Sequence, residues 1–104
     1  MAYDYEITEK AYHDIDEAIN YIAIDLHNKK AALELLNKIY STIEKICDYP
    51  LLYPDCTYFF IMDTNYRHAV INNYTLVYKI MNGKIIIIRF KHSKQNRVLH
   101  SNLW

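Results

Sequence analysis

The fold is decided by one stretch near the C-terminus, Ile85-Ile86-Ile87-Ile88-Arg89-Phe90-Lys91-His92-Ser93-Lys94-Gln95-Asn96-Arg97. Four consecutive β-branched isoleucines favour a buried strand, because such side chains pack well on a pleated sheet. Asn82-Gly83 stands just before them, and this dipeptide is typical of a type I′ turn between two antiparallel strands. The segment from Tyr74 to Met81 is therefore the expected partner strand.

The end of the same stretch carries a cluster of basic residues and no acid. Its members are Arg89, Lys91, His92, Lys94 and Arg97. A rigid strand that ends in such groups is suited to hold positive charge against a phosphate. We therefore expect the working end of the molecule here.

Charge is divided unevenly along the chain, although the net charge is zero. All 12 acidic residues lie at or before Asp63, together with five lysines, whereas the seven basic residues from Arg67 onward have no acid among them. This asymmetry predicts a basic face with a polyanionic partner. The alternative is internal neutralisation, in which acidic helices pack beside a basic sheet.

Length and composition indicate one globular domain, residues 1–104, with 52% hydrophobic residues. The chain has no apolar run that could cross a bilayer, and its acidic start does not look like a signal peptide. We therefore expect a cytoplasmic protein in which Cys47 and Cys56 are reduced thiols. The acids, histidines and cysteines lack the spacing of a metal site, so neither a metal nor a cofactor is expected.

Hydrophobic spacing predicts the remaining elements. A short strand over 2–7 leads through the N-cap Thr8 to a helix that ends near Leu26. Asn28 caps a second helix, which ends at Tyr49-Pro50. Residues 51–65 are expected to be a long loop, followed by strands over 66–71 and 75–80. The apolar face of the first helix consists of Ala11, Ile15, Ala18, Ile19, Ile22 and Leu26.

The predicted order is thus β-α-α-β-β-β, an α+β fold in which an N-terminal strand and a helical hairpin accompany a mainly antiparallel four-stranded sheet. The two-residue turn fixes a register in which Met81 faces Lys84, Val77 faces Ile88 and Leu76 faces Arg89. In this register Val77, Ile86, Ile88 and Phe90 lie under the helices, and Tyr78, Ile87 and Arg89 lie on the open face.

The order of elements resembles the RelE/ParE superfamily of toxins from bacterial type II toxin–antitoxin systems. The residues that carry the resemblance are Thr8-Glu9-Lys10-Ala11, Asp14-Ile15-Asp16-Glu17, Tyr66-Arg67 and the closing segment 88–96. The resemblance implies a toxin held inactive by a cognate antitoxin, with plasmid stabilization as the associated role. RelE-like members cut messenger RNA, usually on the ribosome, whereas ParE-like members poison DNA gyrase and cut nothing.

The resemblance assigns roles to individual residues. Arg67 matches a phosphate-holding arginine of the RelE-like enzymes, and Arg89, His92 and Lys94 lie where their last strand and tail supply phosphate contacts and proton transfer. Metal-independent RNA cleavage needs a base, an acid and cations around the phosphate. His92 is the natural proton carrier. The catalytic candidates are therefore His92, Arg67 and Arg89, and the phosphate-binding candidates are Lys91, Lys94 and Arg97.

Plainer interpretations stand beside these roles. His92 could be a solvated histidine, Arg67 a structural residue packed on tyrosines, and Arg89 a half-buried group bonded to carbonyls. No tyrosine follows Tyr78, whereas RelE-like ribonucleases often have one in the tail. Three functions therefore stay open: a ribonuclease toxin acting on mRNA at the ribosome, a gyrase poison, and a domain that kept only the fold. The ribonuclease is favoured over the gyrase poison, because His92 and the arginines would form a phosphate site.

The first two functions share an antitoxin partner. We expect antitoxin contacts on the helical hairpin and on the segment 51–62, especially Tyr58-Phe59-Phe60. In the absence of the antitoxin, the same aromatic patch could form a homodimer.

Overall fold

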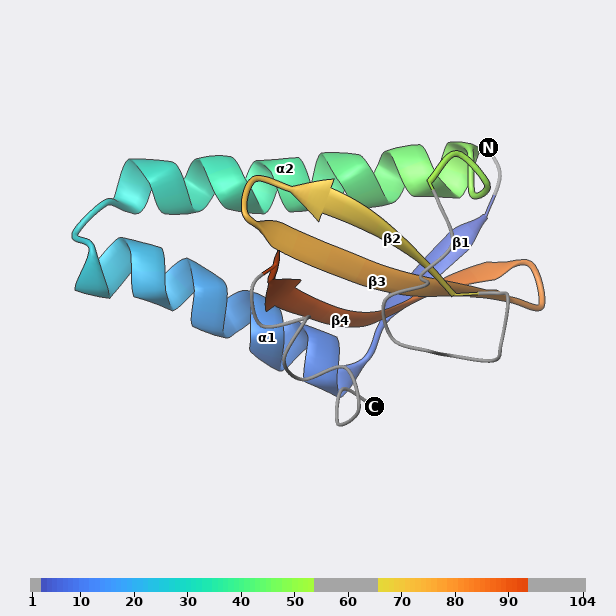
Figure 1. Ribbon diagram of the computed structural model, residues 1–104, viewed down its shortest axis with the longest axis horizontal. Coiled ribbons are helices and arrows are strands. Elements are labelled where there is room, and N and C mark those ends of the chain that lie inside the picture. The colour runs from blue at the N-terminus through green and yellow to red at the C-terminus, as the bar shows by residue number, and fades with distance from the viewer. Residues whose placement is uncertain (1–2, 54–65, 94–104) are drawn as a thin grey trace.

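The computed structural model describes residues 3–53 and 66–93, which form two layers (Figure 1). One layer is a four-stranded sheet of β1 (Asp4–Ile7), β2 (Tyr66–Ile71), β3 (Tyr74–Met81) and β4 (Lys84–His92). The other is an antiparallel helical pair, α1 (Glu9–Asn20) and α2 (Lys29–Asp48), which packs on the sheet. The α+β fold and the order β-α-α-β-β-β are as predicted.

The isoleucine strand lies in the middle of the sheet, whose order is β1-β4-β3-β2. β4 runs parallel to β1 and antiparallel to β3, and β2 is antiparallel to β3. Ile85 and Ile87 are fully buried, as are Leu35, Ile39, Ile43 and Ile46 of α2. The helices cover one face of β4, and Ile86 and Ile88 are partly buried, so all four isoleucines are at least partly shielded from water.

Side-chain caps begin both helices at the predicted residues. The hydroxyl of Thr8 accepts a hydrogen bond from the backbone N–H of Ala11 (3.2 Å) and donates one to the carbonyl of Ile88 (3.2 Å). Asn28 accepts one from the N–H of Ala31 (3.0 Å). Thr8 therefore both starts α1 and ties it to β4.

The end of the first helix differs from the prediction. After Asn20 the chain continues as a π-helical turn, Tyr21–Asp25, and the hairpin turns at His27, which has a φ of 51°. A π-turn takes more residues than an α-turn, so the side chains after it rotate away from the apolar face. Leu26, predicted to belong to that face, is consequently 54% exposed.

The register of the β3–β4 hairpin is correct at its turn and wrong beyond it. Met81 faces Lys84 as predicted, but Val77 faces Arg89 and Leu76 faces Phe90. A β-bulge at Val77/Tyr78 places one extra residue, Ile88, in β4. Its effect is to bury Ile85, Ile87, Phe90 and Tyr78 in the core, while Ile86 and Ile88 are only partly buried. Phe90 lies in the core as predicted. The predicted faces of Ile86, Ile87, Ile88 and Tyr78 were wrong, because periodicity alone does not reveal a bulge.

The prediction that Arg89 lies on the open face was also wrong. Arg89 binds Asp14 of α1 in a bidentate manner, Nε to Oδ2 at 2.8 Å and Nη2 to Oδ1 at 3.2 Å. The same carboxylate accepts the N–H of Phe90 (3.0 Å) and lies 3.2 Å from Nζ of Lys91. The Asp14 side chain is 2% exposed and that of Arg89 14%. Three consecutive residues of β4 thus converge on one buried carboxylate.

This arrangement changes the acidity of Asp14. Burial alone would raise its pKa, but the hydrogen bonds from Arg89, the Phe90 N–H and Lys91, together with the charge of Arg89, outweigh burial and lower it below 3.8. A lowered carboxyl pKa gives stability that is complete above the unfolded-state value and is lost as the pH falls through the folded-state value.

We expect Asp14→Asn to lower the free energy of unfolding by about 3 kcal/mol at pH 7, because it leaves Arg89 without its buried counter-charge. The difference from the unaltered protein should shrink as the pH falls below 3.8, since Asp14 itself then becomes protonated. Urea unfolding at a series of pH values measures both effects. Asp16→Asn, on an exposed residue of the same helix, is the control and should change stability by less than about 0.5 kcal/mol at pH 7. Equal effects of the two substitutions would contradict this account of Asp14.

The turn at Asn82-Gly83 gives a second prediction. Gly83 has a φ of +73°, and no atom lies within 4 Å of where a Cβ would be. Gly83→Ala should therefore cost about 1–2 kcal/mol through backbone strain and not through a clash. Asn82→Gly, at the neighbouring residue with a φ of 54°, should change the unfolding free energy by less than about 0.5 kcal/mol. A neutral Gly83→Ala in urea unfolding would argue against the turn.

Candidate functional site

A cleft of about 610 Å³ opens between α1 and the adjoining ends of β3 and β4. We call it the aromatic cleft, and its lining residues are Asp14, Glu17, Ala18, Tyr21, Tyr74, Phe90, Lys91 and His92. The β3–β4 pairing forms its floor, since Tyr74 and His92 face each other in register. Two of the predicted site residues, Lys91 and His92, therefore line one cleft.

The cleft is built around the ring of Tyr74. This ring stacks on Phe90, with centroids 4.8 Å apart and an angle of 12° between the planes, and meets His92 edge-on at 5.4 Å. Burial, together with the nearby Tyr21, raises the pKa of the Tyr74 hydroxyl. Tyr74 is thus a neutral phenol at physiological pH. The arrangement offers an aromatic platform beside an imidazole, chemistry that suits stacking and proton transfer.

Acids balance the positive charge of the cleft. Asp14 engages both Arg89 and Lys91, as described above. Glu17, on the next turn of α1, lies 3.5 Å from the imidazole of His13. Among the described residues at this end of the sheet, internal neutralisation, in which acidic helices pack beside basic strands, therefore accounts for Arg89 and Lys91 better than a bare basic face does.

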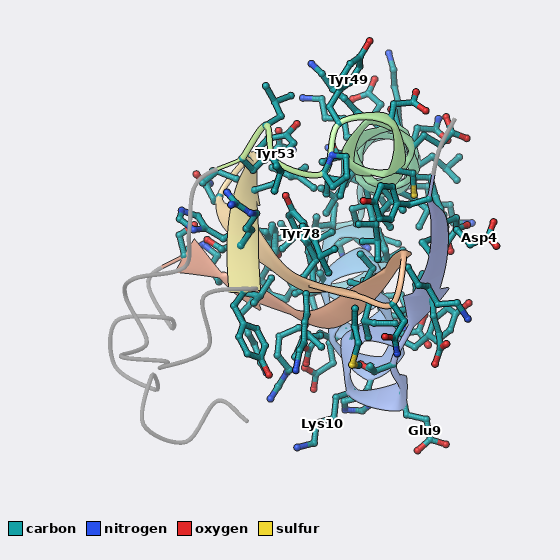
Figure 2. The ribbon with its side chains drawn as sticks, turned by 90° about the vertical axis from the view of Figure 1, so that its right-hand side faces the viewer. Asp4, Glu9, Lys10, Tyr49, Tyr53 and Tyr78 are labelled. Atoms are coloured by element: carbon teal, nitrogen blue, oxygen red, sulfur yellow. The ribbon has the colours of Figure 1, made fainter. Side chains whose placement is uncertain are left out.

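Arg67 lies elsewhere in the sheet. It faces Tyr78 on β3, whereas His92 faces Tyr74, so the two are separated by four residues along the strands and by two strand spacings, about 16 Å in all. Its Nη1 donates a hydrogen bond to the carbonyl of Tyr53 at 2.7 Å. In Figure 2, Tyr53 lies to the left of the end of α2 and Tyr78 lies below that end. The Tyr78 hydroxyl donates a hydrogen bond to the carbonyl of Pro50 at 2.7 Å.

The predicted site residues therefore fall into two groups. Arg89, Lys91 and His92 lie together at the end of β4, whereas Arg67 fastens the segment after α2 to the sheet. Lys94, Arg97, Cys56 and the aromatic run 58–60 lie outside the described residues. Cys47 is buried with its thiol free.

Sequence reasoning missed the part of the site that comes from α1. Asp14 lies three residues after Ala11 and four before Ala18, both buried, so it falls within the apolar stripe of the helix. An acid in such a position requires a buried partner, and this signal could have been used. Tyr74 was not identifiable, because its role depends on the register that the bulge sets.

No group of three or more histidine, cysteine or acidic side chains could hold a metal ion within residues 3–53 and 66–93. In the same ranges, no helix is both long and apolar enough to cross a membrane.

The chain resembles known proteins both in sequence and in fold. Residues 5–97 match the family model of the ParE toxin of the type II toxin–antitoxin system parDE. No curated protein sequence gives a significant match. Among solved structures, the chromosomal ParDE system of P. aeruginosa superposes with a TM-score of 0.69 at 14% identity, covering 86% of this chain and 95% of that chain.

Two further structures share the fold. The RelBE2 toxin–antitoxin complex of Mycobacterium tuberculosis matches with a TM-score of 0.59 at 15% identity, covering 88% of this chain and 99% of that one. The DinJ-YafQ complex of E. coli matches with a TM-score of 0.61 at 16% identity, covering 91% and 97%. Because the family model spans most of the chain and the fold agrees, the protein belongs to the ParE toxin family of type II toxin–antitoxin systems.

Proposed function

We propose that this toxin acts by binding, as a ParE-like poison of DNA gyrase, and that a cognate antitoxin neutralises it in the cytoplasm. The observation that carries the proposal is that Arg89 and Lys91 both form ion pairs with Asp14. A toxin that works through protein contacts needs shape and exposed side chains, and does not need free cations around a phosphate.

Cleavage of RNA would make heavier demands on the same residues. The scissile phosphate gains charge in the transition state and needs cations that are free to approach it. Drawing Arg89 away to a phosphate would leave the carboxylate of Asp14 buried without its bidentate partner, at a cost of about 3–5 kcal/mol. Arg67, the other predicted phosphate ligand, lies about 16 Å from His92 by strand register. Family membership also supports the gyrase proposal, because the family model that matches the chain is that of the ParE toxin.

One observation favours the ribonuclease as a second candidate. His92 lies beside the stacked rings of Tyr74 and Phe90 in a cleft that Lys91 also lines. An unpaired base can stack on such rings. In this alternative, His92 transfers the proton, and Arg89 and Arg67 bind the scissile phosphate. The backbone of the mRNA on the ribosome is bound by Lys91, Lys94 and Arg97.

Induced expression separates the two functions. Under the gyrase proposal, supercoiling falls and cleaved DNA accumulates within minutes, primer extension on an abundant message shows no new ends, and His92→Ala stays toxic. Purified protein should likewise inhibit gyrase in a supercoiling assay that contains no RNA.

The ribonuclease predicts the opposite pattern. New RNA ends that disappear in His92→Ala, with supercoiling intact, would overturn the gyrase proposal. Glu17→Gln, an exposed residue of the same cleft, is the control for non-specific effects. A soluble protein that is inactive in both assays would contradict both candidates.

A further inference from the structure

A second hollow lies at the end of the molecule away from the aromatic cleft. Its main part, about 620 Å³, is lined by Tyr3, Asp4, Tyr5, Glu44, Cys47, Asp48 and Lys84. An adjoining part of about 400 Å³ is lined by Tyr3, Asp48, Tyr49, Pro50, Leu51 and Leu52. Because the two parts share Tyr3 and Asp48, they form one surface, which we call the end groove. Figure 2 faces this end, with Asp4 projecting from β1 and Tyr49 at the end of α2.

One half of the end groove is acidic. Asp4, Glu44 and Asp48 are exposed, and within residues 3–53 and 66–93 their carboxylates have no ion-pair or hydrogen-bond partner. The C-terminus of α2 adds partial negative charge at the same place. Burial and then these three carboxylates raise the pKa of the Cys47 thiol, which agrees with acids gathered around it. Lys84, at the rim, lies 3.5 Å from Glu6.

The other half is apolar and exposed. Tyr49 is 63% exposed, Leu51 69% and Leu52 55%, and together with Pro50 they form the segment directly after α2. Single exposed apolar residues are ordinary, but a contiguous patch beside a hollow is typical of a docking surface. Hydrogen bonds fix this segment, from the Tyr78 hydroxyl to the Pro50 carbonyl (2.7 Å) and from Arg67 to the Tyr53 carbonyl (2.7 Å). The surface is therefore preformed, which lowers the entropy cost of binding.

We propose that the end groove is a docking site for the cognate antitoxin, which lays apolar side chains on Tyr49, Leu51 and Leu52 and places a lysine or arginine among Asp4, Glu44 and Asp48. Charge complementarity decides the occupant. A second copy of this chain, paired through the same groove about a two-fold axis, would bring carboxylates against carboxylates. A partner with a basic and apolar segment meets both halves of the groove. The inference depends on membership of the toxin–antitoxin family and does not depend on gyrase being the target.

The test is calorimetric titration of the full chain with the intact cognate antitoxin at low and at high salt. Asp4→Asn with Asp48→Asn should weaken binding at least tenfold at low salt and less at high salt, because screening weakens the lost attraction. Leu51→Ser with Leu52→Ser should weaken binding at least tenfold at both salt concentrations. The control is Val70→Thr, which changes an exposed apolar residue of β2, outside both the end groove and the helical hairpin. The antitoxin affinity of this control should stay within twofold of that of the unaltered chain.

Each outcome bears on the proposal. Unchanged antitoxin affinity in both groove variants would overturn the proposal. If only the leucine variant lost affinity, the claim that the antitoxin places a basic residue among the carboxylates would be overturned. A dimer of the free chain that the groove variants dissociate, with antitoxin affinity intact, would assign the surface to a second copy and also overturn it. Equal melting temperatures of all variants exclude misfolding as a cause. Gyrase inhibition by the same free variants reports separately on the proposed function.

Discussion

A single buried carboxylate joins the first helix to the last strand. Asp14 receives the guanidinium of Arg89, the backbone N–H of Phe90 and the ammonium of Lys91, all from consecutive residues of β4. A buried charge is tolerated only when it is paired and hydrogen-bonded, so this contact fixes how α1 lies on the sheet. Thr8, which precedes α1, joins the same two elements, because its hydroxyl donates a hydrogen bond to the carbonyl of Ile88, the residue before Arg89.

The same contact determines what the basic end of β4 can do. Had Arg89 and Lys91 been free, the cluster would have formed a strong anion site beside His92. With Asp14 among them, the cleft is nearly neutral and mainly aromatic, lined by Tyr21, Tyr74 and Phe90. Basic side chains thus serve structure at one end of the molecule, while acids that have no partner among the described residues collect at the other. A toxin that recognises proteins fits this distribution better than a general binder of polyanions.

The fold could be predicted because its signals are local. The four isoleucines, the Asn82-Gly83 turn and the caps Thr8 and Asn28 each specify an element within a few residues. The candidate site could be predicted only in part, because it depends on a bulge and on a contact across 75 residues. One extra residue in β4 lets Ile85 and Ile87, in place of Ile86 and Ile88, share the buried face with Phe90. It also places Arg89 against α1. No helical or strand period carries that information.

The most direct test of this account is the coupling energy between Asp14 and Arg89, measured by a double-mutant cycle. The four proteins are the unaltered chain, Asp14→Asn, Arg89→Gln and the double variant, each unfolded in urea at pH 7. Since each single variant leaves the remaining residue of the pair buried without its bidentate partner, we expect a coupling of about 2 kcal/mol. A coupling below about 0.3 kcal/mol would mean that the two residues act independently, and would contradict the claim that their contact organises the fold and its charge.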